Sequence, residues 1–387
     1  IALYRNDEKL ADLSRQGSAY IAERFTTQAA AGLMARVLES SLEEAAPRLA
    51  GTQPVRQGYS PPRVIAFHLP QYHAIPENDE WWGDGFTEWR NVRKAKPLFS
   101  GHYQPHVPAD LGYYDLRQEQ TRINQAQLAQ RYGIEGFCYY HYWFKGKRLL
   151  EHPLEELIRS GEPDFPFCIC WANESWSRRW DGKDQDILMK QEYSEQDDRD
   201  HIRSLLPLFE DKRYIRVNGK PLFLVYRVDK LPDPARTADI WREEARAAGV
   251  GELYLCRVES FVKGGPRDVG FDASIEFAPD WWNKGPQLYA DSDVFAGDEA
   301  DLKEVCANNF IHSYQGLAEA MMAKEIPSYK WFRCVTPSWD NWARRHEGAS
   351  VFLGSTPEKY RAWLADTVDD AIERLRGEER IVFINAW

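Results

Sequence analysis

From residue 63 onward, short apolar runs alternate with stretches of helical period. The runs are rich in β-branched and aromatic residues and are bounded by Gly, Pro or charged residues, which is typical of buried strands. Eight such strands are predicted: Val64–His68, Gly136–Trp143, Phe165–Trp171, Pro221–Arg227, Glu252–Val258, Ala273–Phe277, Phe332–Pro337 and Ile381–Ile384.

The stretches between these strands carry apolar residues at helical spacing. The strongest covers 357–375, where Thr356 provides an N-cap, Pro357 occupies the first turn and Gly377 ends the helix. The other predicted helices cover 118–131, 150–160, 196–210, 235–248 and 302–324. Eight strands with crossover helices predict an α/β fold, a (β/α)8 TIM-type barrel over 63–387. An open doubly wound sheet is the alternative, but no Gly-rich phosphate loop follows any strand.

The two ends of the chain predict segments beyond the barrel. Residues 1–46 read as two helices whose apolar stripe needs a partner, as an N-terminal appendage or the end of a preceding domain. Residues 47–62, rich in Pro and Gly, are predicted to be a linker. The last strand lacks the helix that would cover it, so the final βα unit is expected to be truncated and the native chain to continue past Trp387.

Composition excludes some classes of function. A net charge of −11 argues against a nucleic-acid partner, and no stretch is apolar enough to span a bilayer. The 6 Cys include no C-x-x-C pair, which favours reduced core cysteines in a cytoplasmic protein over zinc or disulfides. The 15 Trp, 19 Tyr and 18 Phe include many in polar, loop-like motifs. Such rings suit sugars, which stack on them while their hydroxyls need paired donors and acceptors.

Candidate chemistry gathers at the predicted strand ends, where barrel enzymes place their sites. Amides, carboxylates, His and Arg stand there beside aromatic residues, as in Trp171-Ala-Asn173-Glu174. Each has a structural alternative: His141 could be a core histidine, the arginines could form surface ion pairs, and the tryptophans could pack loops. Neither a metal-binding spacing nor a Ser nucleophile elbow is present, which favours a metal-independent site without a cofactor.

Several motifs resemble one family. His68-Leu-Pro-Gln-Tyr-His73, Trp82-Gly-Asp-Gly-Phe-Thr-Glu88-Trp89, Gly101-His-Tyr-Gln-Pro105, Leu111-Gly-Tyr-Tyr-Asp115, Trp171-Ala-Asn-Glu174 and Asp340-Asn341 are similar to motifs of the WbsX-type proteins. These are glycosyltransferase-like proteins of bacterial O-antigen and polysaccharide loci, related to the endo-α-mannosidases of glycoside hydrolase family 99. The resemblance implies a barrel over 63–387, and residues 1–46 resemble the closing helices of a glycosyltransferase domain.

The resemblance also implies where the reaction would occur. The family pattern continues beyond Trp387 with two glutamates, which in the related hydrolases supply the acid/base and a helper for the sugar 2-hydroxyl. Within this chain, the expected supporting catalytic residues are Glu174, Glu276 and Asp340. The expected substrate-binding residues are His68, Tyr72, His73, Trp81, Glu88, Trp89, His141, Tyr142, Trp143, Trp171, Asn173, Arg227, Asn341, Arg344, Asn385 and Trp387.

Together with these motifs, the resemblance implies an enzyme that cleaves or forms glycosidic bonds in bacterial surface-polysaccharide (O-antigen, lipopolysaccharide) metabolism. Its partner would be an oligosaccharide or polysaccharide, with a nucleotide sugar or lipid-linked glycan as donor if it is a transferase. Arg178, Arg179, Arg344 and Arg345 are the clustered phosphate-binding candidates. We expect it in the cytoplasm or at the inner face of the membrane. A non-catalytic glycan-binding module attached to a glycosyltransferase is the alternative from another class.

Overall fold

The computed structural model describes residues 61–178, 183–290, 299–345 and 347–385, together with 292 and 295. The helices expected in 1–46 and nearly all of the expected 47–62 linker lie outside these residues, as does Trp387. All structural statements below concern the described part of the chain.

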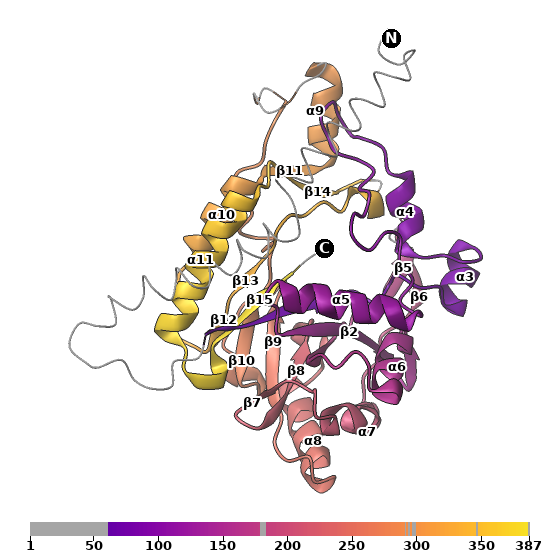
Figure 1. The fold of residues 1–387 in the computed structure, drawn as a ribbon, viewed down its shortest axis with the longest axis vertical. Helices are drawn as coiled ribbons and strands as arrows, with labels where there is room; N and C mark the ends of the chain where they lie inside the picture. Colours follow the sequence, from indigo (N-terminus) through magenta and orange to yellow (C-terminus); the bar gives the residue numbers. More distant parts are fainter. Residues whose placement is uncertain are drawn as a thin grey trace, which may run out of the picture.

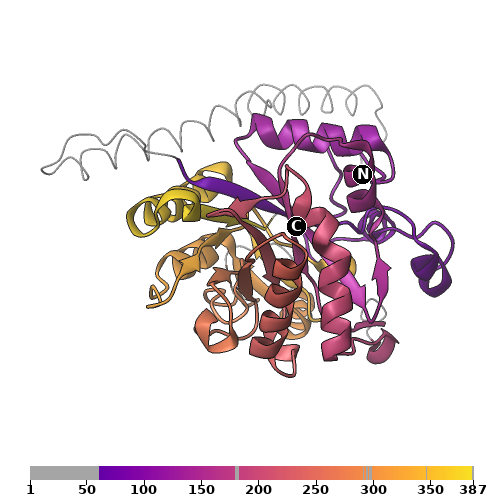
Figure 2. The same cartoon turned by 90° about the horizontal axis from the view of Figure 1, so that it is seen from below.

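Parallel strands form a closed ring in sequence order, which confirms the predicted (β/α)8 barrel (Figures 1 and 2). Each strand pairs with the next one along the chain, and β1 pairs with β15 to join the two ends. All eight predicted strands are present, with boundaries shifted by a few residues. They are β1 (Arg63–His68), β2 (Gly136–Phe144), β4 (Phe167–Trp171), β8 (Lys220–Val225), β9 (Tyr254–Glu259), β10 (Ala273–Glu276), β12 with β13 (Trp331–Phe332 and Cys334–Val335) and β15 (Ile381–Ile384).

The seventh strand of the ring is divided around Arg333. Its first half, β12, pairs with β10 through two residue pairs, and its second half, β13, pairs with β15 through two more. The strand turns from one neighbour to the other at the break. The ring is therefore closed by two short pairings, whereas β2 and β4 share five residue pairs.

Helices cover the outside of the ring. In Figure 1, α10 and α11 run side by side along one flank, and α7 and α8 cover another. The predicted cap of the last helix is confirmed, since the Thr356 side chain accepts a hydrogen bond from the Lys359 N–H. The helices are α3 (Pro76–Trp82), α4 (Glu88–Lys94), α5 (Glu119–Arg131), α6 (His152–Ser160), α7 (Glu195–Glu210), α8 (Pro234–Ala247), α9 (Glu299–Asn308), α10 (Tyr314–Met322) and α11 (Pro357–Arg374).

The single helix predicted over 302–324 is wrong. The chain leaves the helical path after Asn308 and forms β11 (Phe310–Ser313), which pairs in parallel with β14 (Ser350–Leu353). Asn309 secures the break, because its side-chain oxygen accepts a hydrogen bond from the Ala349 N–H at 3.1 Å. Pairing with a strand distant in sequence thus overrides the local helical pattern.

Small antiparallel pairings accompany the barrel: two of them extend barrel strands, and one forms a separate two-stranded sheet. They were not predicted, because each involves only two or three residues on one side. They join β3 (Lys147–Leu149) to β2, β5 (Trp176–Arg178) to β6 (Lys183–Met189), and β7 (Arg216–Val217) to β8.

The inside of the barrel is filled by large side chains. The Phe67 ring lies 5.6 Å from Tyr140, 6.4 Å from Phe277 and 5.5 Å from Phe383, so it contacts strands around the ring. All six cysteines are buried and free, which confirms the prediction of core cysteines. This packed interior closes the barrel below the carboxyl ends of the strands and forms the floor of the site.

Candidate functional site

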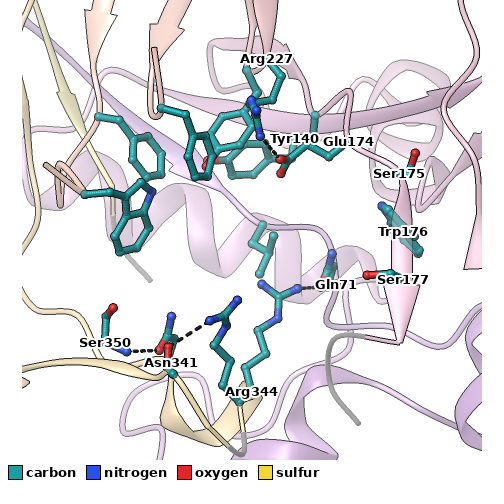
Figure 3. A pocket seen from close by; sticks show the side chains of 18 of the residues that line it. Gln71, Tyr140, Glu174, Ser175, Trp176, Ser177, Arg227, Asn341, Arg344 and Ser350 are labelled. Atoms are coloured by element: carbon teal, nitrogen blue, oxygen red, sulfur yellow. Dashed lines mark hydrogen bonds and ion pairs between the residues drawn. The ribbon is translucent and has the colours of Figure 1, made fainter. Parts of the chain in front are cut away.

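A cavity of about 540 Å³ opens at the carboxyl end of the barrel (Figure 3). Its walls come from loops after several strands, as is usual for barrel enzymes, and its size suits a small ligand. Aromatic side chains make up much of the wall. Those that line it are Trp81, Trp82, Tyr140, Tyr142, Trp176, Tyr226, Phe261, Phe277, Trp281, Phe310 and Trp339.

The aromatic rings form two groups at the cavity. Trp176 packs edge-to-face against Trp81 at 6.0 Å and against Tyr142 at 5.1 Å. Trp281 packs edge-to-face against Trp339 at 5.7 Å. Rings supported by their neighbours keep a fixed orientation, which suits stacking against the apolar face of a ligand.

Tyrosine hydroxyls add polar groups to the cavity. Tyr142 accepts a hydrogen bond from the Gln71 amide at 3.2 Å. Burial raises the pKa of Tyr142 and of Tyr226 well above the ordinary tyrosine value. Both hydroxyls therefore keep their protons at neutral pH and can donate to a ligand oxygen.

Glu174 and Arg227 form an ion pair at one side of the cavity (Figure 3). Arg227 also bonds Asp229 at 2.8 Å and lies 4.2 Å from the centre of the Phe261 ring. Burial acts to lower the pKa of Arg227, but Asp229 and Glu174 hold it above its usual range. Because the side chain of Glu174 remains 35% exposed, its carboxylate can still accept hydrogen bonds from a ligand.

Asn173 holds the backbone of Arg227 in place and so positions this ion pair. Its side-chain oxygen accepts from the Arg227 backbone N–H at 2.8 Å, and its amide donates to the Arg227 carbonyl at 2.8 Å. The amide also donates to the Tyr193 hydroxyl at 3.2 Å. Asn173 is fully buried, so it joins the ends of β4 and β8 rather than facing the cavity.

The opposite side of the cavity carries more cations. Arg344 reaches from the 3₁₀ turn η5 (Trp342–Arg344) and donates to the Gln71 side-chain oxygen at 2.8 Å (Figure 3). Behind it, Glu88 forms an ion pair with Arg344 at 3.0 Å. Burial raises the pKa of Glu88, and Arg344 opposes that shift. Glu88 therefore contributes by holding Arg344 rather than by lining the cavity.

Six predicted site residues line the cavity, and most of the others lie elsewhere. The residues brought together are Trp81, Tyr142, Glu174, Arg227, Asn341 and Arg344. Those outside the lining are His68, Tyr72, His73, Glu88, Trp89, His141, Trp143, Trp171, Asn173, Glu276, Asp340 and Asn385. Among the predicted phosphate binders, Arg345 also lines the cavity, whereas Arg178 does not and Arg179 lies outside the described residues.

Four of the residues away from the cavity point out of the barrel wall. His68 bonds Gln125 of α5 at 3.1 Å, and His141 faces His201 of α7 at 3.0 Å. Trp171 contacts the same His201 ring at 4.5 Å. Trp143 packs there too, at 5.0 Å from His201. These side chains fill the layer between the strands and the helices.

Two predicted catalytic carboxylates, Glu276 and Asp340, lie outside the cavity lining and bind other side chains of the protein. Glu276 is fully buried, with Lys324 at 2.7 Å and Arg333 at 3.5 Å. Asp340 accepts from Gln104 at 2.6 Å and contacts His102 at 2.9 Å. Burial acts to raise the pKa of Asp340, but the hydrogen bonds from the histidines hold it well below its usual range.

The remaining predicted residues support loops. Tyr72 packs on Trp89 at 4.4 Å, and the Trp89 indole donates to the Tyr114 carbonyl at 2.8 Å. His73 is buried, and burial lowers its pKa to about 4. The buried Asn385 amide donates to the Ala278 carbonyl at 2.7 Å.

Some lining residues were not predicted. Tyr140 and Tyr226 face the inside of the barrel and line the cavity. Tyr140 differs from the adjacent His141, which does not line the cavity, only in the face of the strand that it occupies. Lys284 and Phe310 come from loop and strand segments with no local motif. In the described chain, no group of three or more His, Cys, Asp or Glu is arranged to hold a metal ion. Nor does any helix in that part combine the length and apolar character needed to cross a membrane.

The fold and cavity define a (β/α)8-barrel protein with a cavity lined by aromatic and polar side chains. Residues 64–387 match the family described as Glycosyltransferase WbsX, and the chain belongs to that family. Proteins named uncharacterized protein WxcX from two strains of Xanthomonas campestris pv. campestris are 44% identical over 331 residues, covering 84% of this chain. That alignment covers 46% of their length, so the chain spans about half of these curated relatives.

Solved structures with a similar fold include a glycoside hydrolase-like protein (14% identity, TM-score 0.48, covering 87% of each chain). The GH99 endo-alpha-mannosidase from Bacteroides thetaiotaomicron is also similar (12% identity, TM-score 0.47, covering 84% of each chain).

Proposed function

We propose that this chain is the sugar-binding barrel of a carbohydrate-active enzyme that cleaves or forms glycosidic bonds. The observation that carries the proposal is the Glu174–Arg227 pair on an aromatic-lined cavity at the carboxyl end of a (β/α)8 barrel. Membership of a family described as glycosyltransferases supports it. The setting we propose is surface-polysaccharide metabolism in the bacterial cytoplasm, with an oligosaccharide, a nucleotide sugar or a lipid-linked glycan as substrate.

In this proposal the cavity binds a sugar by its two kinds of surface. The rings of Trp176 and Trp281 stack on the C–H faces of the sugar. Glu174 accepts hydrogen bonds from sugar hydroxyls, and Tyr142 and Tyr226 donate to sugar oxygens. A carboxylate beside the anomeric carbon also stabilises the positive charge that develops there during cleavage or transfer.

A second candidate is a non-catalytic glycan-binding module. One observation favours it: among the described residues that line the cavity, Glu174 is the only carboxylate. Hydrolysis of a glycosidic bond generally uses two carboxyl groups on either side of the scissile bond. A module that only binds glycans needs the rings and hydrogen-bonding groups but not the second acid.

The test is a screen of oligosaccharides and nucleotide sugars against the chain, read by mass spectrometry and by calorimetry. New reducing ends from an oligosaccharide alone would identify a hydrolase. Elongated product that appears only with a nucleotide sugar would identify a transferase. Binding without turnover would support the glycan-binding module, and the absence of binding to any glycan would overturn both candidates.

A further inference from the structure

One wall of the cavity is cationic. Its cations are Lys284, Arg344 and Arg345, and we call it the cationic wall. The Ser350 N–H donates to the Asn341 side chain at 2.7 Å, and Ser350 pairs with Phe310, whose ring lies beside Lys284. In Figure 3, Arg344 extends into the cavity from the side opposite Glu174 and Arg227. The cavity therefore places an accessible carboxylate and a group of cations at opposite sides.

Two of the arginines at the cavity have carboxylate partners. Arg227 is paired with Glu174 and Asp229, and Arg344 is paired with Glu88. The whole chain carries a net charge of −11, so cations concentrated in the cavity run against the charge of the surface. A wall that carries several cations attracts a ligand group of negative charge, even though Glu174 lies at the opposite side of the cavity.

Lys284 is the lysine of the cationic wall. It is half-buried, and its ammonium lies 4.4 Å from the centre of the Phe310 ring. No carboxylate of the described residues forms an ion pair with it, and burial lowers its pKa. Keeping this cation in a partly desolvated position costs free energy, which an anion in the cavity would offset.

We infer that the cationic wall binds an anionic group carried by the glycan, either the carboxylate of an acidic sugar or the phosphate of a glycosyl phosphate. Both present the same chemistry, an oxyanion attached to a sugar ring. The inference rests on the proposed function, because the sugar itself would occupy the aromatic part of the cavity. The amide of Asn341 and the hydroxyl of Ser350 add neutral hydrogen-bonding groups to the same wall.

The experiment compares matched sugars that differ only in the anion. Glucose, glucuronate and glucose 1-phosphate form one set, and the galactose and mannose equivalents form two more. Binding to the full chain is measured by ligand-observed NMR and calorimetry. We expect an anionic member to bind at least tenfold more tightly than its neutral partner in at least one set. Preference for the uronate identifies a sugar carboxylate, and preference for the 1-phosphate identifies a phosphate.

The variant Lys284→Met should reduce that preference at least tenfold, and Lys284→Arg should retain it, since the guanidinium keeps the charge. Circular dichroism checks that both variants fold. Equal binding of neutral and anionic members, no binding by any member, or an unchanged preference in Lys284→Met would each overturn the inference. If neutral oligosaccharides still bind in those cases, the proposed function stands.

Discussion

Tyr142 and Trp143 are adjacent in β2 but face opposite sides of the barrel wall. Tyr142 lines the cavity and accepts a hydrogen bond from Gln71 at 3.2 Å. Trp143 faces α7, where its indole donates to the Asp197 carboxylate at 3.0 Å. Successive side chains of a strand alternate between its faces, so one residue meets the ligand while the next anchors a helix.

Because the two faces of the barrel wall have different roles, one tryptophan variant should mainly lose glycan affinity and another should mainly lose stability. Trp176→Ala, which removes a cavity ring, should weaken glycan binding at least tenfold while the free energy of unfolding changes less. Trp143→Ala should lower the free energy of unfolding by about 3–5 kcal/mol and leave glycan affinity nearly unchanged if the variant stays folded. Calorimetry and urea unfolding measure the two effects. A larger loss of affinity in Trp143→Ala would contradict this assignment of faces.

Glu174→Gln tests the carboxylate of the cavity. It keeps the size of the side chain but removes the charge, so we expect turnover to fall at least tenfold in an active enzyme. The melting temperature should change little, since Arg227 keeps its contact with Asp229. Glu192→Gln is the matched control, because it makes the same change in an exposed pair with Lys145. Turnover near the wild-type level in Glu174→Gln would exclude a role in the reaction.

Asn173→Ala tests the link between the ends of β4 and β8. The change leaves the backbone N–H and carbonyl of Arg227 without their buried partners, so the free energy of unfolding should fall by about 1–3 kcal/mol. Asn124→Ala, on the exposed face of α5, should change it by less than about 0.5 kcal/mol. Chemical denaturation of both variants gives the comparison, and equal effects would contradict the proposed link.

Three histidines with little exposure should make the protein acid-sensitive: His73 and His141 are buried, and His68 is half-buried. Burial lowers the pKa of His68 and of His73 to about 4, and that of His141 to about 3. In the unfolded chain each takes up a proton near pH 6.5, whereas in the folded protein each stays neutral. The free energy of unfolding is therefore highest above pH 6.5. It decreases as the pH falls from 6.5 toward 4, because only the unfolded chain binds these protons.

Urea unfolding at pH 7.5 and pH 5.0 measures this loss, which we expect to be about 2 kcal/mol for each histidine at pH 5.0. Asp198 opposes it, since burial raises the pKa of that carboxyl to about 6 and so favours the folded state at lower pH. His68→Gln should reduce the difference between the two pH values. A protein equally stable at both would show that these histidines are accessible to protons in the folded state.

The apolar runs sufficed to predict the barrel, because most residues of its strands are buried. Because the strands are buried on both faces, their sequences do not indicate which side chains face the cavity. All nine residues of β2 are buried, so no polar alternation distinguishes Tyr140 and Tyr142 from His141 and Trp143. The partners of two strand-end carboxylates, Asp340 and Glu276, could not be predicted from the sequence either. His102, which contacts Asp340, lies in the Gly101-His-Tyr-Gln-Pro105 motif, but the motif does not indicate its partner. Lys324, which contacts Glu276, comes from a loop without such a motif.

The division of the seventh strand at Arg333 has a consequence for how the barrel opens. Two residue pairs hold β12 to β10, and two hold β13 to β15, so this seam is the thinnest part of an otherwise continuous cylinder. Amide protons along the seam should exchange with solvent before those of β2 and β4. Trp339 and Arg344 lie in the segment that follows β13. Local opening at the seam would therefore loosen that side of the cavity, while the side formed by Glu174 stays in place.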